Sequence, residues 1–257
     1  MNLRHEAGGI CAQETGSAGG KLVRLEVGGL MSRGVARRKV LRAALAGAAV
    51  WVSPAFGPFA PGPGFAQTQL TPDQALDLLL EGNRRFVAGR LTSDAEDLAI
   101  LKAHTVEKQE PFAAVLSCAD SRVPVELIFD QSIGHVFVTR VAGNVATTEM
   151  IASLEYGAAV LGTRLILVLG HANCGAVKAA IAGKEVPGQI SALYLPLRAA
   201  VTEAGSDLTA AIKANARIQA RLLSEASPVI GGMVKAHKIR VAAAYYDVSD
   251  GRVTMLT

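Results

Sequence analysis

The chain is poor in the residues that characterise several classes of protein. Only 5% of its 257 residues are aromatic, 19% are charged and three are cysteine. So few cysteines exclude a disulfide-dense scaffold, and a hydrophobic fraction of 50% argues against disorder. The apolar run at 43–52 is too short for a transmembrane helix, which needs about 20 residues, and it meets Pro54. We therefore expect one or two folded domains and no stable membrane span.

Acidic residues are scarce only at the start of the chain. The net charge is +4, but residues 1–66 contain 8 Lys and Arg against 3 Asp and Glu, whereas residues 67–257 contain 18 against 19. The excess positive charge therefore belongs to the first segment. A nucleic-acid groove needs basic side chains clustered on the folded domain, so we expect no nucleic-acid partner.

Residues 1–66 are typical of a leader and not of a folded domain. Residues 1–30 are glycine-rich and are consistent with an overextended start, with the true initiator at Met31. Within 31–66, the pair Arg37-Arg38 precedes the apolar run, as in a twin-arginine export signal. We expect cleavage near Ala66–Gln67, a periplasmic location and a mature domain at 67–257; an uncleaved leader is the alternative.

Apolar runs alternate with helical periodicity along the mature domain. Thr71 and Pro72 predict a capped helix that begins the domain. We expect helices at 71–89, 98–106, 147–161, 176–182 and 208–223, and strands at 112–117, 135–139, 164–170, 240–247 and 253–256. This alternation predicts an α/β fold with a mostly parallel sheet flanked by helices and an N-terminal helical arm.

Metal-binding side chains follow two of the predicted strands. Cys118 follows the strand at 112–117, and His171 and Cys174 follow the strand at 164–170. The carboxyl ends of parallel strands line one crevice, and two thiolates with one imidazole are ligands that zinc prefers. Three protein ligands leave a fourth position open for catalysis. The alternative is a Cys118–Cys174 disulfide, since an oxidising compartment favours one.

A carboxylate and a guanidinium close to Cys118 favour the catalytic interpretation. Zinc lowers the pKa of a bound water to about 7, and Asp120 is placed to orient the resulting hydroxide. Arg122 would hold that carboxylate ionised in a bidentate pair. The alternatives are turn or cap chemistry for Asp120 and a surface charge for Arg122.

Four segments together resemble the β-class carbonic anhydrases: CADSRVPVELIFD, RVAGN, SLEYG and GHANCGAV, in order from about Thr71 to the C-terminus. The resemblance implies one zinc ion per subunit held by Cys118, His171 and Cys174, with Asp120 and Arg122 as catalytic residues. It implies reversible hydration of carbon dioxide to bicarbonate and a proton by a zinc-bound hydroxide. It also implies a homodimer or a dimer of dimers, in which the helical arm packs on the partner.

The resemblance extends to a substrate pocket and to the state of the zinc site. It implies that four residues line the carbon dioxide pocket: Gln109, Phe137, Tyr156 and Gly175. Of these, Gln109 and Tyr156 would contribute to the pocket of the partner subunit. Core packing is the alternative for Phe137 and Tyr156. Closed members of the family carry Trp and Gly where this chain has Val115 and Ser117. We therefore expect an open form, since Asp120 would be a zinc ligand only in a closed one.

Two other functions remain open from the sequence. The same zinc site could hydrolyse carbonyl sulfide or carbon disulfide, or the chain could be a non-catalytic periplasmic module that binds zinc or carries a disulfide. If the chain hydrates carbon dioxide, four residues are candidates for carrying the released proton to solvent: His104, His135, His237 and Tyr156. The sequence does not choose among them.

Overall fold

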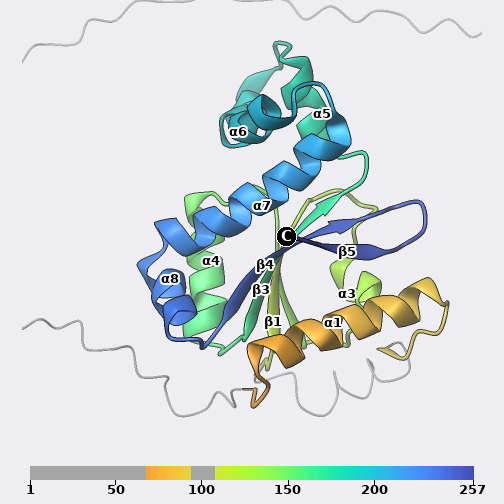
Figure 1. Ribbon diagram of the computed structural model, residues 1–257, viewed down its shortest axis with the longest axis vertical. Coiled ribbons are helices and arrows are strands. Elements are labelled where there is room, and N and C mark those ends of the chain that lie inside the picture. Colours follow the sequence, from red (N-terminus) through yellow and green to blue (C-terminus); the bar gives the residue numbers. More distant parts are fainter. Residues whose placement is uncertain (1–67, 94–107) are drawn as a thin grey trace, which may run out of the picture. The chain divides into compact units, whose positions relative to one another are not determined.

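The computed structural model describes residues 68–93 and 108–257 (Figure 1). The chain divides into two units, Met1–Ser53 and Pro54–Thr257, and all the described residues belong to the second. The predicted leader, its cleavage site, the helix predicted at 98–106 and His104 lie outside the described residues. Within the described part, no helix is both long and apolar enough to cross a membrane.

Five strands form one sheet in the order β2-β1-β3-β4-β5. The strands are β1 (Ala113–Ser117), β2 (Val136–Arg140), β3 (Leu165–His171), β4 (Arg240–Tyr246) and β5 (Val253–Leu256). The first four are parallel, and β5 is antiparallel to β4. The mostly parallel sheet is thus confirmed, and each strand begins and ends within one residue of its predicted bounds.

Helices occupy the connections between the strands. They are α1 (Pro72–Val87), α3 (Val125–Ile128), α4 (Thr148–Ala159), α5 (Gly175–Ala182), the 3-10 helix η2 (Gly188–Leu193), α6 (Tyr194–Ala204), α7 (Leu208–Ala226) and α8 (Pro228–Lys235). The predictions for α1, α4, α5 and α7 are confirmed. The predicted ranges do not include α3, η2, α6 or α8. The four residues of α3 are too few to show helical periodicity.

Helices cover both faces of the sheet, which is why β1 and β3 are buried along their whole length (Figure 1). Alternate residues of each strand point to opposite faces. Val115 and Leu167 pack with α1 and α3, whereas Leu116 and Val168 pack with α4, α7 and α8. The continuous apolar character of these strands follows from this double burial.

The N-terminal helix α1 packs on the sheet of its own chain. It begins with a capping box in which Thr71 and Gln74 exchange side-chain and backbone hydrogen bonds. Asn83 then donates to the carbonyl oxygens of Ile128 and Gly251, at 3.1 and 2.8 Å, and accepts from the Val253 N–H. These contacts join α1 to α3 and to the β4–β5 turn within the subunit.

The strand order reverses between β1 and β3. The chain passes from β1 to β2 on one side and then crosses to β3 on the other side. The segment after β1 leads to α3 on one face, and the segment after β3 leads through α5 to α7 on the opposite face. Ligands of open α/β sheets bind at such a switch point, where the two connections diverge.

Candidate metal centre

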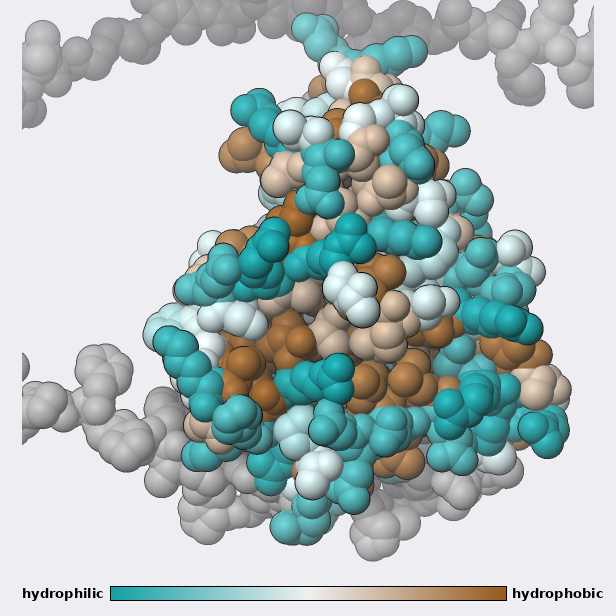
Figure 2. All heavy atoms as spheres, viewed as in Figure 1, coloured by the Kyte–Doolittle hydropathy of each residue, from teal (hydrophilic) through white to brown (hydrophobic). Residues whose placement is uncertain are grey.

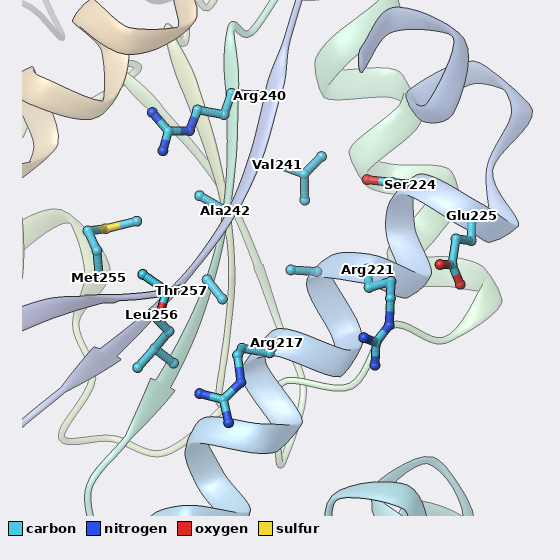
Figure 3. A pocket seen from close by; sticks show the side chains of 12 residues that line it. Arg217, Arg221, Ser224, Glu225, Arg240, Val241, Ala242, Met255, Leu256 and Thr257 are labelled. Atoms are coloured by element: carbon cyan, nitrogen blue, oxygen red, sulfur yellow. The ribbon is translucent and has the colours of Figure 1, made fainter. Parts of the chain in front are cut away.

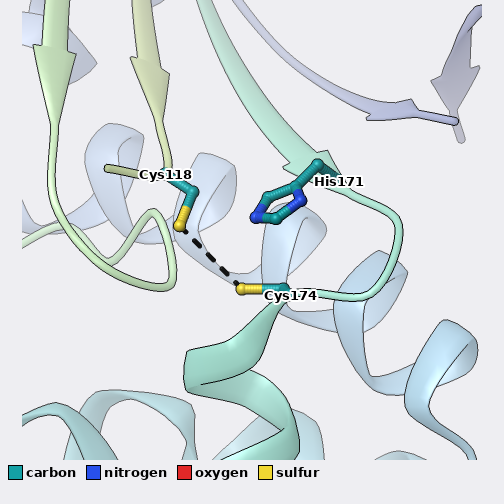
Figure 4. Close-up of side chains that lie close together, drawn as sticks. All are labelled: Cys118, His171 and Cys174. Atoms are coloured by element: carbon teal, nitrogen blue, oxygen red, sulfur yellow. Dashed lines mark hydrogen bonds between the residues drawn. The ribbon is translucent and has the colours of Figure 1, made fainter. Parts of the chain in front are cut away.

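Three metal-binding side chains meet at this switch point (Figure 4). Cys118 follows β1 directly, His171 is the last residue of β3, and Cys174 is the N-cap of α5. Their ligand atoms all lie within 4.8 Å of one another, and none of the three residues is more than 4% exposed. One ion could therefore contact all three.

The hydrogen bonding of His171 leaves one ring nitrogen for a metal. Nδ1 lies 3.0 Å from the carbonyl oxygen of Ala172, which can only accept, so Nδ1 carries the proton in the neutral ring. Nε2 then bears the lone pair, and it is buried with no hydrogen-bond partner among the described residues. Such a nitrogen fits a metal ligand, because the hydrogen bond at Nδ1 fixes the tautomer that leaves the Nε2 lone pair free.

The two sulfur atoms belong to free thiols. Their separation of 4.0 Å is about twice the 2.05 Å length of a disulfide bond. The neighbouring Cys174 thiol and the Gly143 N–H outweigh burial and lower the pKa of Cys118. The hydrogen bond to Cys118, burial and the charge on Cys118 raise the pKa of Cys174. Because two neighbouring thiolates repel each other, both sulfurs lose their protons only when a cation lies beside them. Zinc fits a site with two sulfur ligands and one imidazole nitrogen.

Asp120 and Arg122 form a bidentate pair at the edge of the cluster. Arg122 donates from Nε to Oδ1 of Asp120 at 2.9 Å and from Nη2 to Oδ2 at 2.7 Å. These bonds from Arg122 hold the pKa of the Asp120 carboxyl well below its usual value. Oδ2 also lies 4.0 Å from Nε2 of His171. An ionised carboxylate therefore faces the ligand atoms while it remains bound to arginine.

Two residues that the sequence reasoning did not single out also hold Cys118. Arg140, at the end of β2, donates to the carbonyl oxygens of Cys118 and Asp120, at 2.9 and 2.5 Å. The Gly143 N–H donates to Cys118 Sγ at 3.3 Å. Both residues lie in the segment RVAGN, and Arg140 is in register with Ser117 on the neighbouring strand. Their roles become visible only once β2 is known to lie beside β1.

Of the predicted pocket residues, Gly175 is next to a ligand in the sequence, since it follows Cys174 and begins α5. The rings of Phe137 and Tyr156 contact each other with centroids 6.3 Å apart, and Tyr156 is 45% exposed. Gln109 is exposed as well. No contact described within this subunit joins Gln109, Phe137 or Tyr156 to the cluster, so their role in the pocket stays a prediction.

Two of the histidines proposed as proton relays are at the wrong end of the sheet. His135 precedes β2 and His237 precedes β4, whereas the metal-binding side chains follow the carboxyl ends of the parallel strands. A five-residue strand is about 17 Å long. That separation is too large for a short relay within one subunit.

A hollow of about 630 Å³ opens between α7 and the strands β4 and β5 (Figure 3). Arg217 and Arg221 extend from α7, and Met255 and Leu256 lie opposite on β5. Figure 2 shows hydrophilic side chains along α7 and an apolar area beneath them over the sheet. The lining of this hollow includes no residue of the cysteine and histidine cluster.

Comparison with known proteins identifies related chains. A family model described as "Carbonic anhydrase" matches residues 113–253, more than half of the chain. Carbonic anhydrase 2 of Mycobacterium tuberculosis is 47% identical over 111 residues, which cover 43% of this chain and 53% of the relative. The chain thus spans about half the length of the curated relative that it matches.

Solved structures share the fold. The Coccomyxa β-carbonic anhydrase in complex with acetazolamide superposes with a TM-score of 0.57 and 27% identity, over 70% of this chain and 86% of that one. A tetrameric β-carbonic anhydrase of the ascomycete Sordaria macrospora gives a TM-score of 0.57 at 20% identity, over 71% of this chain and 97% of that one. The second likeness concerns the fold alone.

Proposed function

Because the chain belongs to the β-class carbonic anhydrase family, we propose that it catalyses the reversible hydration of carbon dioxide to bicarbonate and a proton. The observation that carries this proposal is the convergence of two cysteine sulfurs and one imidazole nitrogen within 4.8 Å. Cys118, His171 and Cys174 would hold one zinc ion per subunit. Zinc bound there would lower the pKa of a water ligand to about 7 from 15.7.

The residues around the cluster have distinct tasks in this reaction. Asp120 presents Oδ2 toward the ligand atoms and, because its carboxyl stays ionised, accepts a hydrogen bond from the reacting water. Arg122 fixes the orientation of that carboxylate through two parallel bonds. Burial of the three ligands keeps bulk water away from the sulfur atoms.

We propose that the site is of the open form, in which Asp120 is not a ligand. Both Asp120 oxygens already accept hydrogen bonds from Arg122, and Asp120 is outside the cluster of ligand atoms. Val115 and Ser117, at positions where closed members carry Trp and Gly, are consistent with this form.

We propose that the active species is a homodimer or a dimer of dimers. The exposed Tyr156 and Gln109 are available to a partner subunit, where they would contribute to the substrate pocket. The Sordaria relative is described as tetrameric. Sedimentation velocity of the full chain tests this, and a monomer with full activity would overturn it.

We also propose export to the periplasm through the twin-arginine-like signal at 31–66. A route that carries folded proteins would let the thiolates bind zinc in the reducing cytoplasm. Replacing Arg37 and Arg38 together by Lys should retain the protein in the cytoplasm. Export of active enzyme at the normal level by that variant would contradict the proposal.

The alternatives gain no support. The sulfur separation of 4.0 Å argues against a disulfide-bonded module, and the matched relatives are described as carbonic anhydrases rather than as hydrolases of carbonyl sulfide or carbon disulfide.

Stopped-flow measurement of carbon dioxide hydration on zinc-assayed protein tests the function directly. We expect about one zinc per chain and turnover well above that of the buffer, from the full chain and from protein that begins at Gln67. Arg122→Ala should lower kcat/KM, whereas Arg221→Ala, at the hollow of Figure 3, should not. A chain without stoichiometric zinc, or a zinc-loaded chain without hydration activity, would overturn the proposal.

A further inference from the structure

We propose that Asn215 and Gln219, two buried amides on α7, position the hydrogen bond that Cys118 Sγ receives, and so set how tightly the site holds zinc. This inference rests on the proposed zinc site. Neither residue contacts a ligand atom, so both act as positioning residues through the loop that contains Gly143.

The two amides form one pair on the inner side of α7. They are four residues apart, which places them on the same face of the helix, and each is 1% exposed. Nε2 of Gln219 donates to Oδ1 of Asn215 at 3.1 Å. Their neighbours on α7 are mainly alanine and other apolar residues, among which an amide without partners would destabilise the fold. Their remaining hydrogen bonds therefore matter.

Those hydrogen bonds hold both ends of the segment 143–146. Asn215 Nδ2 donates to the Gly143 carbonyl oxygen at 2.8 Å, and Gln219 Oε1 accepts from the Ala146 N–H at 2.9 Å. Gln219 Nε2 also reaches the Pro196 carbonyl oxygen at 3.3 Å, which joins α6 to the same network. The loop is thus fixed at two points by one helix.

Gly143 transmits this restraint to the sulfur atom. Its N–H donates to Cys118 Sγ at 3.3 Å, while its own carbonyl oxygen is held by Asn215. Its φ of +79° lies in the left-handed region, and a Cβ there would come within 3.3 Å of Ala176 Cβ and 3.4 Å of Leu197. Glycine therefore fits this position beside α5 and α6, and the bond from Asn215 to its carbonyl oxygen sets the direction of its N–H.

The direction of that N–H bears on metal binding. A donor aimed at a thiolate stabilises its negative charge, and removal of groups that orient metal ligands lowers metal affinity or activity by about 10- to 100-fold. Loss of the Asn215 donor leaves the Gly143 carbonyl oxygen without this partner and frees the loop to turn. The expected result is weaker zinc binding with the three ligands unchanged.

The test compares Asn215→Asp and Gln219→Glu with Leu223→Val in the full chain. Asn215→Asp keeps an oxygen toward Gln219 but loses the donor to Gly143, and Gln219→Glu loses the donor to Asn215 and Pro196. Leu223 is a buried residue of the same helix outside this network, so Leu223→Val controls for lost stability. Zinc affinity is measured by competition with a chromogenic chelator, and the thiolate environment by the charge-transfer band of the cobalt-substituted protein.

We expect about 10- to 100-fold weaker zinc binding and a shifted cobalt band for the Asn215 variant, a smaller effect for the Gln219 variant, and neither change for Leu223→Val. If Asn215→Asp does not fold, Gln219→Glu carries the comparison. Wild-type affinity and an unshifted band in the folded variants would overturn the inference. Zinc binding that depends on Asn215 in a chain without hydration activity would instead overturn only the proposed function, and a wild-type chain that binds no zinc would overturn both.

Discussion

Asp120 receives three hydrogen bonds from Arg122, two from the guanidinium and one from the backbone N–H. Because this pairing holds the pKa of Asp120 below its ordinary value, the carboxylate stays charged at any pH above about 4. The pH dependence of catalysis near neutrality should therefore not reflect titration of Asp120.

Asp120→Asn should retain zinc but lower kcat by about 100-fold, because a neutral amide is a weaker acceptor for the reacting water. Stopped-flow hydration and metal analysis of the same sample measure both quantities. Asp250→Asn is a matched control, since Asp250 accepts from the N–H of Arg252 two residues later, as Asp120 does from Arg122, but lies on the β4–β5 turn. Wild-type turnover in Asp120→Asn would refute the assigned role.

The buried carboxyl of Asp130 leads to a prediction about how the stability of the fold depends on pH. Burial alone would raise the pKa of this carboxyl, but bonds from Arg85, from the Ser93 N–H and from Thr92 outweigh burial and lower it. A carboxyl whose pKa is lower in the folded state stabilises the fold above its unfolded pKa of about 3.9, and this contribution is lost as the pH falls further. Asp130→Asn should cost about 2–3 kcal/mol at pH 7 and flatten the loss of stability below pH 4.

Urea unfolding of both proteins between pH 3 and pH 7 checks this. An unchanged slope of stability against pH in the variant would show that Asp130 is not the group responsible.

At the scale of elements, α1 approaches α3 so closely that only glycine fits between them. A Cβ on Gly82 would lie 1.7 Å from the carbonyl oxygen of Phe129, a backbone atom that cannot move aside. Gly82→Ala should therefore lower stability by more than about 2 kcal/mol, through displacement of the helix. Gly232→Ala on α8 is the control, because its Cβ would meet no atom within 4 Å.

That control should gain up to about 1 kcal/mol from the better helix propensity of alanine. Thermal unfolding of the two variants gives the comparison. Equal stability of Gly82→Ala and the wild type would mean that the two helices are not in close contact.

The strands β1 and β3 were predictable because burial on both faces makes each one a continuous apolar run, and the three ligands because each stands at the end of such a run or just after it. Arg140 was not, since its contacts depend on which strands are neighbours, and strand order is not a local property of the sequence. Asn215 and Gln219 look like ordinary helix residues until α7 is placed beside the loop at 143–146.

At the scale of the whole molecule, zinc would connect the two layers of helices across the end of the sheet. Cys118 precedes the connection to α3, and Cys174 begins the connection toward α7 on the other face. A ligand that binds only the folded state at a thousand times its Kd stabilises that state by about 4 kcal/mol. Removal of zinc should therefore lower the Tm by about 10 °C.

Differential scanning calorimetry before and after chelation measures this shift. Zinc, but not magnesium, should restore the original Tm, since thiolates and imidazole are poor ligands for magnesium. The same Tm with and without the chelator would contradict a zinc ion that bridges the two segments.

The near-complete burial of Cys118, His171 and Cys174 affects how fast a bound metal ion could exchange with the solvent. An ion surrounded by protein on most sides leaves only when the neighbouring loops open, so it equilibrates slowly with the medium outside. The metal found in a purified sample would then be the one acquired as the chain folded. Elemental analysis would report the ionic composition of the cellular compartment where folding took place, even after the protein had moved elsewhere.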